Sequence, residues 1–355
     1  MISQSPLQEK TLFERFELEE QEFINIIQIR NLDSVVKENL GIIQSFRDTL
    51  SLALLRAYKN NKNCERTHLF IQRILYFINR LKIFWYDKLT NYINEDSLLI
   101  QEIKLEIESS WSAWENEQIN REQIKYLNVE TFLKERVEVD LNPLPDEDSL
   151  FLRNKISILG YKRLLAIASL DGLVEASQLS RTLGGVCTEV QLMLTKILWE
   201  EYGGGKVSHK HSSHFTHMLE ECHMETKPEA YFNIVPWEVL ANINHSYYLS
   251  EKKQNYLRYN GGLLYTEVSA PSAFLNYLKA GERIGLSKKA TGYWDIHIKE
   301  DIRHGHWMLN DVALPLAEQY NDDAWQIIWG YDQQKFISSR AIRSIVKSIR
   351  KLNKF

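Results

Sequence analysis

Residues 293–305 read YWDIHIKEDIRHG, and this stretch carries the strongest indication of both fold and function. It places His297, Asp301 and His304 at offsets of zero, four and seven, which on an α-helix span an arc of about 60°. The three side chains therefore point to one side of the predicted helix. Burying two imidazoles and a carboxylate together is costly unless a cation pairs with them, and a divalent metal ion does so. An exposed polar helix face is the simpler alternative for this stretch taken alone.

Further candidate ligands stand elsewhere in the second half of the chain. A metal ion inside a helical bundle takes its ligands from facing helices. An ionisable residue in a segment of small or apolar residues is out of place without such a partner. Residues of this kind are Glu175 in SLDGLVEASQLS and Glu267 in GGLLYTEVSAP. Two further candidates are Glu201, which closes one predicted helix before GGGK, and His211, which opens the next.

The complete set contains four carboxylates and three histidines. Such donors suit iron, manganese or zinc, and their number favours a carboxylate-bridged pair of metal ions over a single zinc. A structural zinc would favour tight cysteine pairs, which the sequence lacks. Glu300 is an alternative ligand because its offset of three from His297 keeps it near the same helix face. The other histidines after residue 200 are expected at the surface or outside the ligand set: His209, His214, His217, His223, His245 and His306.

Composition limits the classes of partner. The chain has 355 residues and a formal net charge of −4. So small a charge gives no reason to expect nucleic acid or an anionic membrane as a partner. No apolar run is long enough to span a membrane, and the N-terminus lacks the layout of a secretion signal. Cys64, Cys187 and Cys222 are far apart, which is typical of a protein in a reducing cytoplasm without structural disulfides.

Helical periodicity dominates the whole chain, as in the stripe formed by Ile43, Phe46 and Leu50. We therefore predict an all-α protein. The clearest break is DLNPLPDEDS at 140–149, where two prolines end a helical region. It divides the chain into an N-terminal helical region, 1–145, and a helical bundle with a C-terminal helix, 146–355.

Glycine-rich stretches are expected to interrupt or end helices in the predicted bundle, since glycine supplies a permissive backbone. These stretches are 201–206, 260–262 and 280–285. The helices predicted around them are 150–170, 172–183, 187–201, 207–222, 246–260, 262–281, 288–304, 306–320 and a tail helix at 323–350.

The order of the candidate ligands resembles a known family. Two segments are similar to the most characteristic segments of the haem-oxygenase-like diiron oxidases and oxygenases. The first is EYGGGKVSHKH, which contains Glu201 and His211, and the second is HIKEDIRH, which has the pattern His-x3-Asp-x2-His. The resemblance covers residues 150–320. It implies a haem-oxygenase-like helical bundle, two iron ions and O2 as co-substrate. It also implies that the N-terminal region, 1–145, serves contacts in a homodimer.

The resemblance further implies a ligand set made of all seven candidates. One iron is expected on Glu201, His211 and His304, and the other on Glu175, His297 and Asp301. Glu267 would bridge or cap the pair. A haem protein is the less suitable alternative, because it needs a single proximal histidine over a large apolar pocket.

The activity implied is that of a monooxygenase or oxidase in small-molecule biosynthesis, supplied by an external electron donor. N-oxygenation of an amine or amino-acid-derived substrate is expected first, with oxidative desaturation or C–C cleavage of an amino or fatty acid as the alternative. A non-enzymatic helical interaction protein is the remaining alternative. Arg283 and Arg303 are candidate clamps for a substrate carboxylate or ordinary surface charges. Trp199, Tyr265 and Trp294 are expected in core packing.

Overall fold

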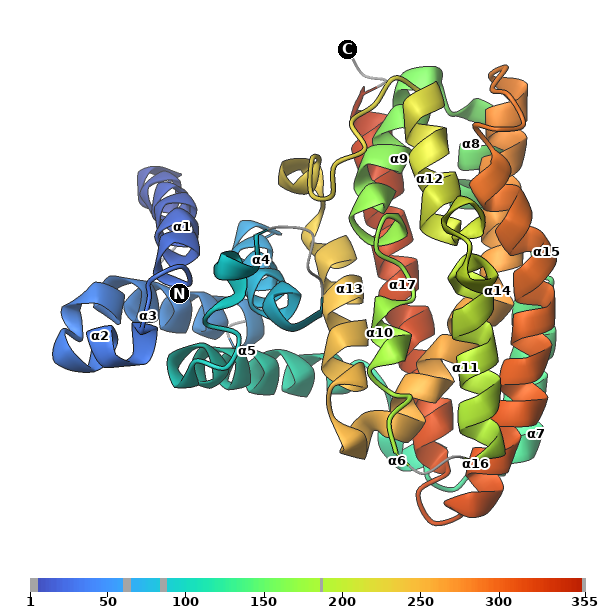
Figure 1. The fold of residues 1–355 in the computed structure, drawn as a ribbon, viewed down its shortest axis with the longest axis horizontal. Helices are drawn as coiled ribbons and strands as arrows, with labels where there is room; N and C mark the ends of the chain where they lie inside the picture. The colour runs from blue at the N-terminus through green and yellow to red at the C-terminus, as the bar shows by residue number, and fades with distance from the viewer. Residues whose placement is uncertain (1–5, 60–64, 84–87, 186–187, 353–355) are drawn as a thin grey trace. The chain divides into compact units, whose positions relative to one another are not determined.

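A computed structural model describes residues 6–59, 65–83, 88–185 and 188–352. Within these ranges the regular elements are all helices, which confirms the all-α prediction (Figure 1). The chain divides into two compact units, residues 1–118 and 119–355. The break expected near residue 145 lies inside the second unit by this division. No described helix is both long enough and apolar enough to cross a bilayer.

The first unit consists of helices that pack through aromatic side chains. Phe16 stacks on Phe70 with ring centroids 4.9 Å apart, and Phe23 stacks on Phe46 at 4.7 Å. These rings join α1, α3 and α4 in one core. The helices are α1 (Pro6–Ile26), α2 (Leu32–Glu38), α3 (Gly41–Leu54), the π-helical η1 (Leu55–Lys59), α4 (Glu65–Ile83), η2 (Leu89–Tyr92) and α5 (Leu98–Asn116).

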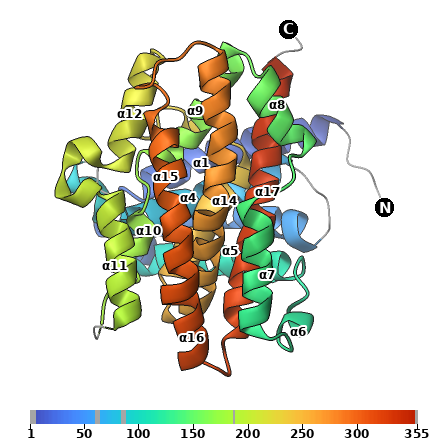
Figure 2. The same ribbon diagram turned by 90° about the vertical axis from the view of Figure 1, so that its right-hand side faces the viewer.

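The second unit is a helical bundle whose central helix is α14 (Tyr256–Arg283). This helix contacts α7, α8, α13, α15 and α17, and Figure 2 shows α14 between α15 and α17. The other elements are α6 (Arg121–Ile124), α7 (Val129–Leu141), α8 (Glu147–Lys155), α9 (Ile158–Gly172), α10 (Ser177–Ser180), α11 (Glu189–Glu201), η3 (Gly203–Gly205), η4 (Val207–His209), α12 (His211–Glu221), η5 (Phe232–Ile234), α13 (Trp237–Ser250), η6 (Lys253–Asn255), α15 (Gly292–Trp307), the π-helical η7 (Met308–Ala313), α16 (Leu314–Gln319) and α17 (Trp325–Leu352).

The glycine pair at 261–262 does not interrupt a helix, so that prediction is wrong. Both glycines lie inside α14, where the helix backbone crosses α17. A Cβ on Gly261 would lie 2.0 Å from the carbonyl oxygen of Ile327, and a Cβ on Gly330 would lie 2.0 Å from that of Arg258. The missing side chains therefore let the two longest helices of the bundle touch backbone to backbone.

We expect Gly261→Ala to destabilise the bundle by about 3 kcal/mol or more, because the new methyl overlaps a backbone that cannot move freely. The neighbouring Gly262→Ala is the matched control, since its Cβ would meet its nearest atoms at an ordinary 3.5 Å. Alanine also has the better helix propensity, by about 1 kcal/mol. Thermal unfolding followed by circular dichroism compares the two variants, and equal melting temperatures would contradict this account of the crossing.

The apolar core of the bundle forms two clusters, with polar residues between them along α15. Trp294 belongs to one cluster and Met308 to the other. His297, Asp301 and His304 lie between these two positions and are buried. The predicted division into helices 288–304 and 306–320 is wrong, because α15 continues through the π-helical η7 into α16. π-Helical turns within α-helices occur frequently at functional sites.

Candidate metal centre

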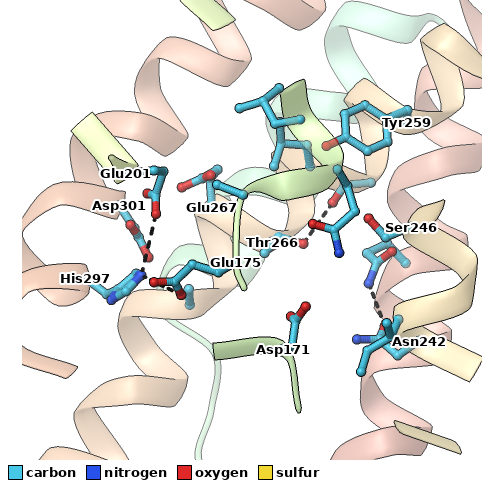
Figure 3. Close-up of a pocket in the computed structure, with 18 of the residues that line it drawn as sticks. Asp171, Glu175, Glu201, Asn242, Ser246, Tyr259, Thr266, Glu267, His297 and Asp301 are labelled. Atoms are coloured by element: carbon cyan, nitrogen blue, oxygen red, sulfur yellow. Dashed lines mark hydrogen bonds and ion pairs between the residues drawn. The ribbon is translucent and has the colours of Figure 1, made fainter. Parts of the chain in front are cut away.

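Five segments of the bundle bring the candidate ligands together, and Figure 3 shows several of them around one pocket. Glu175 does not lie on the predicted helix 172–183. It lies in a turn between α9 and α10, where Ala176 has a positive φ of 62°. The remaining positions are Glu201 at the end of α11, His211 at the start of α12, Glu267 within α14, and His297, Asp301 and His304 on α15.

A tight glycine loop joins Glu201 to His211. Gly203 has a φ of +64°, and a Cβ there would lie 2.4 Å from the backbone carbon of His209. Only glycine therefore lets the chain double back at this point. The return places His211 Nδ1 2.8 Å from Glu201 Oε2, although ten positions separate the two residues in the sequence.

The first group of donors comprises Glu175, Glu201, His211 and His297, each with one donor atom within 4.8 Å of the others. His211 Nδ1 lies 3.0 Å from His297 Nε2. His297 Nε2 lies 3.8 Å from Glu175 Oε2 and 4.0 Å from Glu201 Oε2. Two imidazoles and two carboxylates thus face one small volume, as they would around a metal ion.

The second group comprises Glu201, Glu267 and His304. His304 Nδ1 lies 3.3 Å from Glu267 Oε2 and 3.6 Å from Glu201 Oε1. Asp301 Oδ1 is also 3.6 Å from this nitrogen. Glu201 therefore belongs to both groups: its Oε2 faces His211 and His297, and its Oε1 faces His304.

Each histidine has its other ring nitrogen directed at an acceptor outside the two groups. His297 Nδ1 lies 2.9 Å from the backbone carbonyl of Tyr293. His211 Nε2 lies 3.0 Å from Glu300 Oε2, and His304 Nε2 lies 3.0 Å from Glu200 Oε2. Outer acceptors of this kind fix the ring and its tautomer in metal sites, and leave the inward nitrogen free to bind the metal.

The electrostatics of the cluster are those of donors that lack a cation. Burial lowers the pKa of His297 to about 4. Burial also opposes protonation of His211, but hydrogen bonds to Glu201 and Glu300 outweigh it and raise the pKa of His211 to about 10. Burial also opposes protonation of His304, but the interaction of its imidazole with the Glu267 carboxylate outweighs burial and raises the pKa of His304 to about 9.

The pKa values of two of the carboxyl groups shift upward, which favours their neutral, protonated form. Burial, followed by the charge of Glu201, raises the pKa of Glu175 well above its ordinary value. Burial, followed by the charges of Glu267 and Glu201, does the same for the pKa of Asp301. Carboxylates crowded in this way hold protons unless a metal ion neutralises them.

The residues fit a pair of divalent metal ions. Among the described side chains, Glu175 Oε1, Asp301 Oδ1 and His304 Nδ1 are buried without a hydrogen-bond partner. Buried polar atoms seldom stay unpaired, and a bound cation would pair with all three. Imidazole nitrogens and carboxylate oxygens are also the donors that iron prefers in helical bundles.

The grouping differs from the expected division of ligands between two irons. His211 stands with His297 and Glu175 rather than with His304, and Glu201 rather than Glu267 is the shared carboxylate. Glu300, the alternative ligand, contacts the outward nitrogen of His211. His245 is buried within α13 and belongs to neither donor group, which is one of the two positions expected for it.

Sequence reasoning missed Glu200, the outward partner of His304. Its Oε2 accepts hydrogen bonds from His304 Nε2 and, at 2.6 Å, from Arg303 Nη2. The only indication in the sequence is that it directly precedes Glu201. Because the ion pair with Arg303 holds the carboxylate that orients the imidazole, Glu200 would act on a bound metal ion through His304.

We expect Glu200→Gln to weaken iron binding by about 10- to 100-fold, which is the usual cost of losing an outer acceptor. Equilibrium competition with a chelator under anaerobic conditions measures the change. Glu189→Gln is the matched control, since Glu189 lies exposed in the first turn of the same helix, α11. An unchanged affinity in Glu200→Gln would mean that Glu200 does not position His304.

A cavity of about 220 Å³ opens beside the candidate ligands. Glu175, Glu201, Glu267, His297 and Asp301 line one part of it. Apolar side chains line another part, and the rest is polar. The apolar lining includes Leu179, Ile243, Leu249, Leu263, Ala270 and Phe274. A small molecule in this space would lie directly against the donor groups.

Comparison with known proteins agrees with this geometry. Residues 162–333, which include all seven candidate ligands, match the family described as iron-containing redox enzymes. Over 157 residues the chain is 29% identical to the nitrosourea synthase of Streptomyces achromogenes subsp. streptozoticus. That alignment covers 43% of this chain and 32% of the relative, so the chain spans about a third of the relative's length. The resemblance inferred from the ligand order and the prediction of an oxidoreductase are confirmed: the part of the chain that holds the candidate ligands is similar to the iron-containing redox enzymes.

Proposed function

We propose that this protein is an O2-activating, non-haem diiron oxidase or oxygenase that N-oxygenates an amine or amino-acid-derived small molecule. The observation that carries the proposal is the position of Glu201, whose two carboxylate oxygens face two separate donor groups. When bound, two ferrous ions would supply electrons that activate O2.

The ligands would divide as the donor groups do. Glu175, His211 and His297 would hold one iron, and Glu267 and His304 would hold the other. Glu201 would contribute a carboxylate oxygen to each site. Asp301 would complete the second site, since its carboxylate is buried 3.6 Å from His304 Nδ1.

The chain's own residues would orient the ligands and exclude bulk water. The Tyr293 hydroxyl donates a hydrogen bond to Glu175 Oε2, which holds that carboxylate toward His297. Phe274 contacts the His297 ring edge-on, with centroids 5.2 Å apart. Apolar walls of this kind confine the reaction and keep the ligand side chains in place.

Similarity to a nitrosourea synthase supports N-oxygenation in a biosynthetic pathway. Desaturation or C–C cleavage of an amino or fatty acid would use the same centre and is the second candidate. The non-enzymatic alternative is set aside because the matched family consists of redox enzymes.

Product mass distinguishes the reactions. N-hydroxylation takes one oxygen atom from O2 into the substrate, and the second oxygen leaves as water with two electrons and two protons from an external donor. We therefore expect the iron-loaded chain, supplied with a reductant, ¹⁸O2 and a panel of amines, to give a product carrying one ¹⁸O on nitrogen. A product lacking two hydrogens, or a cleaved carbon chain, would support the second candidate.

Two further parts of the proposal concern the whole protein. We propose that the N-terminal helical region, 1–145, forms the contacts of a homodimer, and light scattering of the full chain tests its mass. A reducing cytoplasmic location remains a prediction. Cys222 is free and buried, whereas Cys64 and Cys187 lie outside the described residues.

A further inference from the structure

The cavity beside the donor groups contains a carboxylate that belongs to neither group. Asp171 lies in the last turn of α9, is half-buried and lines the cavity. Its Oδ1 is buried and has no hydrogen-bond partner among the described residues. Figure 3 shows Asp171 at the pocket, apart from Glu201 and Asp301. This oxygen therefore lacks the partner that a buried acceptor usually has.

Asp171 is not placed to share a metal ion with the candidate ligands. It belongs to none of the clusters whose donor atoms lie within 4.8 Å of one another in the described part of the chain. Burial raises its pKa, while a hydrogen bond from Gln178 acts in the opposite direction. A cation beside it would remove the cost of burying the charge.

No lysine or arginine lines this cavity among the described residues. The two arginines considered as clamps for a carboxylate are engaged elsewhere. Arg303 pairs with Glu200, and Arg283 donates to the backbone carbonyls of Arg153 and Ile156. Asp171 therefore meets no lysine or arginine among the residues that line the cavity.

The remaining polar part of the cavity is uncharged. Gln334 Nε2 donates to Asn242 Oδ1 at 2.8 Å, and Ser338 Oγ donates to the same oxygen at 3.3 Å. Ser246 and Thr266 also line the cavity. These groups can hydrogen-bond a polar ligand, but they do not neutralise a charge.

We infer that Asp171 binds a protonated amine or guanidinium of the substrate. This inference rests on the proposed function and narrows its substrate class. A protonated nitrogen has no lone pair to receive oxygen, so the group at Asp171 serves recognition and a different nitrogen reacts.

The test uses the full chain loaded anaerobically with ferrous iron and three probes of similar length: n-pentylammonium, n-butylguanidinium and pentan-1-ol. Isothermal titration calorimetry should show both cations binding at least tenfold more tightly than the uncharged pentan-1-ol. Asp171→Asn should weaken the binding of the cations by roughly tenfold or more, because it removes one partner of a buried charge pair. It should leave pentan-1-ol binding and iron content unchanged.

Asp322→Asn is the matched control, since it removes the same charge from an exposed turn, and it should bind the cations as the wild type does. Equal cation affinity in Asp171→Asn, pentan-1-ol bound as tightly as the cations, or no cation binding at millimolar concentration would overturn the inference. Loss of iron from Asp171→Asn would also overturn it, by making Asp171 part of the metal centre. If the wild type takes up no iron, the proposed function fails, while titration of the metal-free chain still tests Asp171.

Discussion

Glu201→Ala is expected to remove iron from both halves of the centre, lowering the content from about two irons per chain to nearly none. The reason is that Glu201 Oε2 faces His211 and Glu201 Oε1 faces His304, so one substitution deprives both donor groups of a ligand. Anaerobic loading followed by desalting and elemental analysis measures the content. Helix content should not fall, because Glu201 is the last residue of α11, where a negative charge opposes the helix dipole.

Two variants place this result in context. His304→Ala removes a donor from one group only, so it should leave at most one tightly held iron. Glu189→Ala changes an exposed residue at the other end of α11 and should keep the full content. If Glu201→Ala retains both irons, Glu201 is not the shared ligand and the proposed division is wrong.

Iron binding should release at least two protons per chain near neutral pH, so the apparent affinity should rise about 100-fold per pH unit between pH 7 and 8.5. Metal ligands must be deprotonated, but the metal-free cluster holds protons. Hydrogen bonds to Glu201 and Glu300 overcome burial and raise the pKa of His211 to about 10, and Glu267 similarly raises that of His304 to about 9. Anaerobic calorimetry in buffers of different ionisation enthalpy counts the protons, and release of fewer than one would contradict the cluster's electrostatics.

The metal-free chain provides the control, because its pH dependence should have the opposite sign. A histidine whose folded pKa exceeds its unfolded value of about 6.5 stabilises the fold below that value, and the contribution is lost as pH rises through the folded pKa. The raised pKa values of Glu175 and Asp301 act in the same direction, since their ionised forms are disfavoured in the fold. The melting temperature of the metal-free chain should therefore fall from pH 7 to 9, while that of the iron-loaded chain should not.

The sequence was sufficient to predict the helical class and to select residues that converge. Helical periodicity places His297, Asp301 and His304 on one face, and α15 is a helix at all three positions. A charge among small and apolar residues needs a partner, and Glu267 lies buried in α14. Both arguments depend only on local pattern and on the cost of burying charge.

Features that depend on tertiary contact were not predictable in this way. Gly261 looks like a helix terminator in the sequence, but the contact between α14 and α17 requires glycine inside a helix. The position of Glu175 in a turn depends on the positive φ of Ala176, which alanine rarely adopts. The sharing of Glu201 likewise follows from how α12 and α15 pack around the end of α11, which spacing along the chain does not encode.

The most direct test of a dinuclear centre is anomalous scattering at the iron edge from crystals of the full chain loaded anaerobically with ferrous iron. The account predicts two iron peaks on either side of the Glu201 carboxylate. One should lie among Glu175, His211 and His297, and the other among Glu267, Asp301 and His304. A single peak, or iron bound away from Glu201 under loading conditions, would contradict the central claim.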